Sequence, residues 1–256
     1  MADLIETDRQ GRLLRITLNR PDKRNALNIE LCRQLVVALE RAAADAHVGA
    51  VLLTAKGKAF CAGMDLTEVL AADTAEIHRV QEQLFTIGVR STIPVVAAVH
   101  GAALAGGTGL VANCHVVVAA EDALFGLTEV RIGLWPFLIF RPVAAAVGER
   151  RAVELALTGR TFGAWEARDY GLVHEIAAPA DLEQRAAEIG FVLANSSPTA
   201  VRSGLMFVQE IQHCDWRQVG EIARLARNRV FEGPDFHEGV RAFQEKRAPQ
   251  WPSLGK

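Results

Sequence analysis

Cysteine is scarce in this sequence, and neither charge sign is in strong excess. The 256 residues include four cysteines, which are scattered and form no Cys-x-x-Cys pair or Cys/His cluster. Neither a disulfide framework nor a metal site is therefore expected. A net charge of −2 offers no basic surface for nucleic acid. Residues 1–6 are acidic and lack the apolar centre of a signal peptide. Together these features favour a reducing compartment, with the cytoplasm as the expected location.

Long uninterrupted apolar runs are also absent. The most hydrophobic stretch, 93–120, contains four glycines, two histidines and an asparagine. A membrane-spanning helix tolerates such residues poorly, so we expect a buried core there and no membrane partner. The chain is 50% hydrophobic and 23% charged, which is ordinary for a globular protein.

The first half of the chain alternates strand and helix patterns. Apolar runs or alternation predict strands over 14–18, 48–54, 93–99 and 116–120. Helical spacing predicts a helix after Asn28, a candidate N-cap, and further helices over 77–87 and 107–113. This loosely repeated strand-strand-helix order is typical of an α/β fold with largely parallel strands.

The second half is mostly helical in pattern. Helical spacing recurs over 138–147, 150–157, 181–194, 199–211 and 216–231. We expect an α/β core over residues 1–195 and a helical region over 196–256. That region would pack against the core or against another subunit.

Two loops that follow predicted strands carry the most specific pattern. One reads Phe-Cys-Ala-Gly-Met-Asp-Leu at 60–66, and the other reads His-Gly-Ala-Ala-Leu-Ala-Gly-Gly-Thr-Gly-Leu at 100–110. Each leads into a predicted helix, whose first N–H groups have no intrahelical partner and stabilise negative charge. Donors near Met64 and Gly106 aimed at one point would form an oxyanion hole for a thioester carbonyl and its enolate. Glycine at 106 and 107 would keep substrate approach open, although tight turns that pack backbone on backbone explain the same glycines.

Enolate chemistry also needs a group that moves a proton. Glu129 lies in an apolar neighbourhood, where burial would raise the pKa of its carboxyl group and suit it to proton transfer. The alternative is a surface glutamate paired with Arg131.

The two loops together resemble the crotonase (enoyl-CoA hydratase/isomerase) superfamily, and the likeness covers nearly the whole chain, from 19–28 to 238–247. The family pattern Ala-Gly-x-Asp-Leu matches residues 62–66, and Gly-x-Ala-x-Gly-Gly-Gly matches 101–107 with Ala105 in place of one glycine. The resemblance implies the crotonase (ClpP-like) fold with a helical C-terminal oligomerisation region. It places the oxyanion-hole amides on Met64 and Gly106 and the proton-transfer carboxylate on Glu129.

The resemblance further implies how an acyl-CoA substrate is held. The positions that contact CoA or the acyl group would be Arg24, Ala26, Leu27, Ala62, Asp65, Leu66, Gly107, Gly109 and Trp135, with Phe243 and Lys246 reaching CoA across a subunit boundary. A homotrimer or a dimer of trimers is therefore expected. CoA would arrive with the substrate, and no other cofactor or metal is implied.

The sequence departs from hydratases of this family at Gly109. Those enzymes carry two glutamates separated by 20 residues; Glu129 matches the second, and Gly109 occupies the position of the first. Two carboxylates hold and deprotonate water, whereas one can move a proton from C2 to C4. Isomerisation therefore fits at least as well as hydration, unless Glu76, Glu82 or another residue replaces the missing acid. Bulky residues over 135–140 predict a narrower acyl pocket or, equally, plain core packing.

Two other functions remain open. The chain would be a non-catalytic acyl-CoA-binding homologue if its chemistry was lost with the first glutamate. Residues 107–112 also fit the Gly-x-Gly-x-x-Ala pattern of a dinucleotide-dependent oxidoreductase. The strand that pattern requires before its first glycine is predicted to end too early, at Val99.

Overall fold

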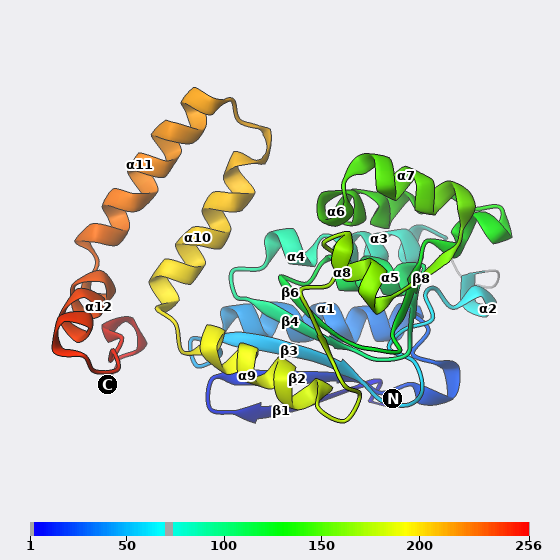
Figure 1. The fold of residues 1–256 in the computed structure, drawn as a ribbon, viewed down its shortest axis with the longest axis horizontal. Coiled ribbons are helices and arrows are strands. Elements are labelled where there is room, and N and C mark those ends of the chain that lie inside the picture. Colours follow the sequence, from blue (N-terminus) through cyan, green and yellow to red (C-terminus); the bar gives the residue numbers. More distant parts are fainter. Residues whose placement is uncertain (1–2, 70–73, 256) are drawn as a thin grey trace.

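The computed structural model describes residues 3–69 and 74–255, and Figure 1 shows an α/β core from which a helical arm extends. Its main sheet has the order β1-β2-β3-β4-β6-β9. These strands span Ile5–Gln10, Leu13–Leu18, Ala50–Ala55, Val95–Val99, Val116–Ala120 and Glu175–Ala177. β1 pairs antiparallel with β2, and every other neighbouring pair in this sheet is parallel. The predicted α/β class and its four predicted strands are confirmed.

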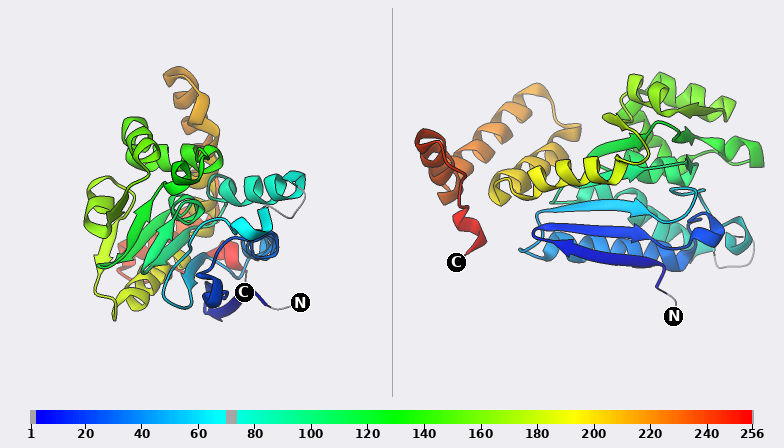
Figure 2. Two further views of the ribbon diagram at one scale, coloured as in Figure 1. Left: turned by 90° about the vertical axis from the view of Figure 1, so that its right-hand side faces the viewer. Right: turned by 60° about the horizontal axis from the view of Figure 1, so that its bottom comes forward.

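The central strands are buried on both faces, which explains why β4 and β6 are wholly apolar and why β3 is apolar except for Thr54. In β3, Val51 and Leu53 belong to one hydrophobic core, and Ala50 and Leu52 belong to the other. The first core lies under α1 (Ile29–Ala44), α3 (Thr74–Phe85) and α5 (Gly106–Ala112), and the second lies under α9 (Leu182–Ala194). Figures 1 and 2 show α1 and α9 near opposite faces of the sheet.

A second, smaller sheet carries the glycine-rich loop. It pairs β5 (Ala102–Leu104), β7 (Leu124–Gly126) and β8 (Thr161–Gly163) in that order. The 3-10 helix η2 (Thr128–Ile132) follows β7 directly. The sequence did not predict these three strands, because three residues are too few to show a period.

The arm consists of α10 (Pro198–Glu210), α11 (Trp216–Glu232) and α12 (Pro234–Glu245), which project from one end of the core in both figures. The remaining elements are η1 (Pro21–Lys23), α2 (Leu66–Val69), α4 (Ile87–Arg90), α6 (Phe137–Val147), α7 (Glu149–Thr158), α8 (Ala164–Asp169), η3 (Ile211–His213) and η4 (Pro252–Leu254). The helices predicted in the second half are thus confirmed. Within the described residues, no helix combines the length and apolar character needed to cross a membrane.

Candidate active site

The two loops singled out in the sequence lie side by side. The N–H of Cys61 donates to the carbonyl of Ala102 at 3.0 Å, and the N–H of Leu104 donates back to the carbonyl of Cys61 at 3.0 Å. The left-handed Gly63, with φ +94°, continues this contact, since a Cβ placed on it would lie 3.3 Å from the backbone nitrogen of Gly106. Gly63 therefore allows the two loops to meet at the point where each turns into a helix.

Two backbone N–H groups at this junction lack an acceptor. Within residues 3–69 and 74–255, nothing accepts a hydrogen bond from the N–H of Met64 or Gly106. Both residues line the same cavity. Unpaired backbone donors are uncommon in folded proteins unless water or a ligand satisfies them. The pair has the character of an oxyanion hole.

The cavity has a volume of about 610 Å³ and is mostly apolar. Its lining comes from α2, α3, the two loops, η2 and the start of α6: Leu27, Ala62, Met64, Leu66, Val69, Ile77, His78, Gln81, Glu82, Phe85, Ala105, Gly106, Thr128, Glu129, Ile132, Leu134, Trp135, Pro136, Phe137, Leu138 and Ile139. A volume of this size suits a small-molecule ligand group.

Glu129 is the buried carboxylate of this cavity. It is 8% exposed, and its Oε2 atom has no hydrogen-bond partner among the described residues. Burial raises the pKa of its carboxyl group to about 7, because removal from water disfavours the charged form. The alternative ion pair with Arg131 is not formed in the described part of the chain. A carboxyl group with this pKa accepts and returns protons near neutral pH.

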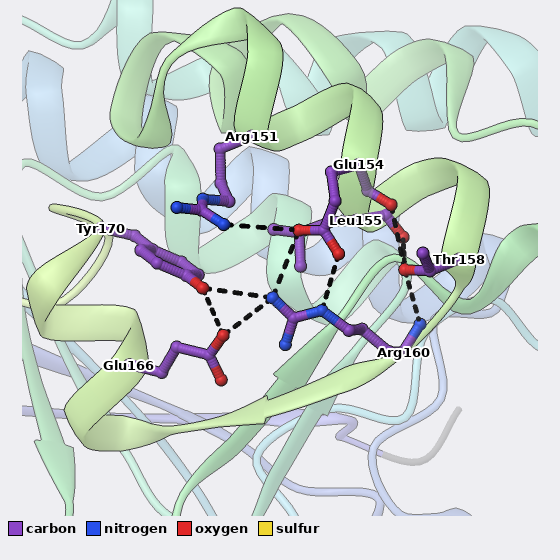
Figure 3. Close-up of polar contacts among 7 residues, drawn as sticks. All are labelled: Arg151, Glu154, Leu155, Thr158, Arg160, Glu166 and Tyr170. Carbon is purple, nitrogen blue, oxygen red and sulfur yellow. Dashed lines mark hydrogen bonds and ion pairs between the residues drawn. The ribbon is translucent and has the colours of Figure 1, made fainter.

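A polar network around Arg160 joins α7 to α8 (Figure 3). Arg160 Nε donates to Glu154 Oε1 on α7 at 2.7 Å, and its Nη2 lies 2.7 Å from Glu166 Oε1 on α8. Gly159, just before it, packs so closely on η2 that a Cβ there would lie 2.8 Å from Val130 Cγ1. The network thus joins α7 to α8, and the close packing at Gly159 places the end of α7 against the 3-10 helix that carries Glu129.

The structure brings together about half of the site residues that the sequence suggested. Met64, Gly106, Glu129, Leu27, Ala62, Leu66 and Trp135 line the cavity, whereas Arg24, Ala26, Asp65, Gly107, Gly109, Phe243 and Lys246 do not. Phe243 is 86% exposed on α12, in the arm outside the core. The roles of these seven residues in binding CoA stay predictions.

At Gly107 the structure favours close packing over substrate approach, and Gly109 is closely packed as well. A Cβ on Gly107 would lie 2.2 Å from the carbonyl oxygen of Cys61, so tight backbone packing is the correct interpretation there. At Gly109 a Cβ would lie 2.2 Å from Ile139 Cγ2 on α6. The space beside Gly109 is therefore occupied by the side chain of Ile139. The same packing gives the Gly-x-Gly-x-x-Ala segment no room to cradle a pyrophosphate.

Asp65 holds the first loop in place. Its carboxylate accepts from Thr67 Oγ1 at 2.6 Å and from Arg20 Nη1 at 2.7 Å. These hydrogen bonds, with that to Thr67 first, lower its pKa to about 2. The same Arg20 nitrogen donates to the carbonyl of Ala26 at 2.9 Å. Asp65 therefore joins the predicted CoA segment 24–27 to the oxyanion loop.

Sequence reasoning missed most of the polar wall on α3. This wall consists of residues at helical spacing, namely His78, Gln81, Glu82 and Phe85. From the sequence, the spacing of this segment predicted only a helix. Glu82 is exposed, and Glu76 is paired with Arg33 outside the cavity. Trp135 and Phe137 line the cavity, and Ile139 also belongs to the hydrophobic core, so core packing is confirmed in part while a narrower acyl pocket stays a prediction.

Comparison with known proteins places this site in a family. Residues 8–254 match the sequence model described as "Enoyl-CoA hydratase/isomerase". The chain belongs to the enoyl-CoA hydratase/isomerase family. It is 38% identical over 248 residues to a putative enoyl-CoA hydratase of Thermus thermophilus, covering 94% of this chain and 98% of that protein. It is 36% identical to the 2,3-dehydroadipyl-CoA hydratase of Escherichia coli, with 98% and 99% covered.

A solved structure supports the same assignment. The crystal structure of an enoyl-CoA hydratase from Mycobacterium smegmatis superposes with a TM-score of 0.92 at 33% identity, covering 98% of this chain and 99% of that one. The protein thus has the crotonase fold and is an acyl-CoA enzyme of the hydratase/isomerase type. Within the described residues, no group of three His, Cys, Asp or Glu side chains is arranged to hold a metal ion.

Proposed function

We propose that the enzyme moves the double bond of an enoyl-CoA by transferring one proton with Glu129. The observation that carries this proposal is the cavity that holds one buried, unpaired carboxylate together with the free N–H groups of Met64 and Gly106. Ile139 fills the space beside Gly109, where related hydratases carry their other glutamate. The buried part of the site is therefore equipped for proton transfer and has no second carboxylate to orient water.

The proposed steps balance within this set of groups. The thioester oxygen accepts hydrogen bonds from Met64 and Gly106. Glu129 takes a proton from C2 of a 3-enoyl-CoA, and the electron pair moves onto the thioester oxygen as a dienolate. The same carboxylic acid then returns the proton to C4, which gives the 2-enoyl-CoA. Only a proton moves, so we propose no cofactor besides the CoA that the substrate carries.

The raised pKa of Glu129 suits both halves of this cycle. With a pKa of about 7, the free enzyme holds carboxylate and carboxylic acid in similar amounts at neutral pH. An unpaired buried carboxyl group costs stability, and a protein that only binds acyl-CoA gains nothing from it. This argues for catalysis over the non-catalytic alternative.

Hydration of a 2-enoyl-CoA is the second candidate. The names of the Thermus and Escherichia relatives favour it. Glu82 supplies a carboxylate at the cavity lining, although it is exposed to solvent. A water held between Glu82 and Glu129 would serve that reaction.

One assay separates the two reactions. Purified enzyme is incubated in D₂O with 3-hexenoyl-CoA or 2-hexenoyl-CoA, and products are followed by mass spectrometry. The proposal expects conversion of 3-enoyl to 2-enoyl thioester to exceed formation of the 3-hydroxyacyl thioester, with deuterium entering at C2 or C4. Hydration as the faster reaction would reverse the assignment, and no turnover of either thioester would support a binding protein.

We further propose a homotrimer, or a dimer of trimers, in which the arm of one subunit reaches the CoA of another. Apolar side chains along the arm are exposed in the isolated chain: Met206, Val208, Trp216, Leu225, Phe231, Phe236, Val240 and Phe243. Exposed apolar surface of this extent marks an interaction site. Phe243 and Lys246 lie outside the cavity of their own chain, as this arrangement requires.

We infer a cytoplasmic location from the thiols. All four cysteines are free, and burial raises the pKa of Cys32, Cys61 and Cys114 to about 12. Unpaired cysteines are usual in reducing compartments.

A further inference from the structure

Gln81 is a buried polar side chain that the proposed reaction does not use. It lies on α3 and lines the cavity, yet it is only 9% exposed. No other described residue makes a hydrogen bond with its amide. Among the described residues, the fully enclosed side-chain atoms without a partner are Arg12 Nε and Glu129 Oε2, so the Gln81 amide retains a surface that a ligand group in the cavity can reach and satisfy.

The surroundings of Gln81 offer little else to satisfy it. Behind it lies a crevice of about 10 Å³ between α1, α2 and α3. A space of this size holds one water at most. The amide can donate two hydrogen bonds and accept others, so its remaining capacity is available to the acyl cavity.

The charge of the cavity restricts what that ligand group can be. Two carboxylates, Glu82 and Glu129, line it, and no lysine or arginine does so among the described residues. A carboxylate at the end of the acyl chain would meet negative charge without a cation to pair with. A neutral group that accepts or donates hydrogen bonds meets no such penalty, and His78 and Glu82 add polar atoms beside Gln81 on the same helix face.

We propose that Gln81 recognises a hydroxyl or carbonyl group on the acyl chain of the substrate. The inference rests on the proposed function, because it takes the cavity to be the acyl pocket. The apolar wall from Trp135 to Ile139 holds the hydrocarbon of the chain, and the α3 wall holds its polar substituent. A binding site whose amide has no protein partner disfavours acyl chains that offer this amide no hydrogen bond.

The test compares binding and turnover with matched ligands. Binding is measured by calorimetry for hexanoyl-CoA, for its hydroxy and oxo derivatives substituted at C4, C5 or C6, and for adipoyl-CoA. Turnover is measured with the corresponding enoyl thioesters. The variants are Gln81→Leu, Gln81→Met as a second apolar replacement, and Gln83→Leu as a control on the exposed side of the same helix. Circular dichroism establishes that each variant is folded.

At least one hydroxy or oxo ligand is expected to bind about tenfold more tightly than hexanoyl-CoA, with adipoyl-CoA the weakest, because each net hydrogen bond contributes on this scale. Gln81→Leu and Gln81→Met should abolish that preference and bind hexanoyl-CoA at least as tightly as the wild type does, because no amide is then left unpaired, whereas Gln83→Leu should keep the preference. The subsite is refuted if the wild type prefers hexanoyl-CoA or adipoyl-CoA. It is also refuted if the Gln81 variants weaken all ligands equally.

The same data separate the subsite from the reaction. A binding preference without turnover of any enoyl thioester would refute the proposed function and leave the subsite standing. Turnover of an enoyl thioester without any binding preference for a hydroxy or oxo ligand would refute the subsite and leave the proposed function standing.

Discussion

Ile139 Cγ2 lies 2.2 Å from the position that a Cβ would take on Gly109, so helix α6 closes the space beside α5. Position 109, where the family resemblance places the first glutamate of hydratases, therefore has neither a carboxylate nor open space for one. Gly109→Glu alone is therefore expected to disturb the packing of α5 on α6 rather than to raise the rate of hydration.

The contact can be tested with small side chains. Gly109→Ala should lower the free energy of unfolding by about 1–3 kcal/mol, the usual cost of overpacking. Gly204→Ala, at an open helical position, should leave stability unchanged or raise it slightly. Gly109→Ala should cost less in an Ile139→Gly background than in the wild type, although Ile139→Gly itself destabilises the core. Additive effects in denaturant unfolding would show that the two residues are not coupled.

The protonation of Glu129 should make stability depend on pH. Its pKa rises on folding from the ordinary 4.5 to about 7, so the folded protein binds an extra proton between these values and loses stability as the pH rises through this window. Glu129→Gln removes a penalty of up to about 3 kcal/mol above pH 7. Thermal unfolding should therefore show the variant as more stable than the wild type at pH 8, with a smaller difference at pH 4.5. An equal difference at both pH values would show that the group ionises normally.

The same pKa should govern catalysis. Because the carboxylate form takes the proton from C2, kcat/KM should rise tenfold per pH unit below about pH 7 and level off above it. A profile already level at pH 5 would place the pKa of the essential base near that of an exposed glutamate.

The exposed apolar side chains of the arm predict that the protein forms a homotrimer or a dimer of trimers. Sedimentation equilibrium at micromolar concentration should give three or six copies of the chain. Phe243→Ser, at a residue 86% exposed in one chain, should weaken acyl-CoA binding. A monomer that binds acyl-CoA as tightly as the wild-type assembly would contradict the shared site.

The part of the fold that could be predicted is the part with a repeating pattern. β4 and β6 are continuous apolar runs, β3 is apolar except for Thr54, and Asn28 caps α1 by accepting from the N–H of Leu31 at 3.0 Å. β1 was missed because five of its six residues are exposed, which leaves no alternation. β5, β7 and β8 have three residues each, and their pairing depends on segments far apart in the chain.

The site residues divide in the same way: local sequence motifs predicted some of them, and tertiary packing determines the others. The loop motifs located Met64 and Gly106, and an apolar neighbourhood located Glu129. Local sequence cannot show that Ile139 fills the space beside Gly109, because the two residues meet only through the packing of α5 and α6. It also cannot show that Gln81 lacks a partner, since that depends on all the elements around α3.

Glu129→Gln tests the central claim most directly. The amide keeps the shape of the side chain but accepts no proton, so turnover of 3-hexenoyl-CoA should fall by about a hundredfold to ten-thousandfold while acyl-CoA affinity stays nearly unchanged. Glu82→Gln, at the exposed carboxylate of the same cavity, is the matched control and should keep most of the isomerase activity. A Glu129→Gln enzyme that retains its turnover, or a Glu82→Gln enzyme that loses it, would contradict proton transfer by Glu129 alone.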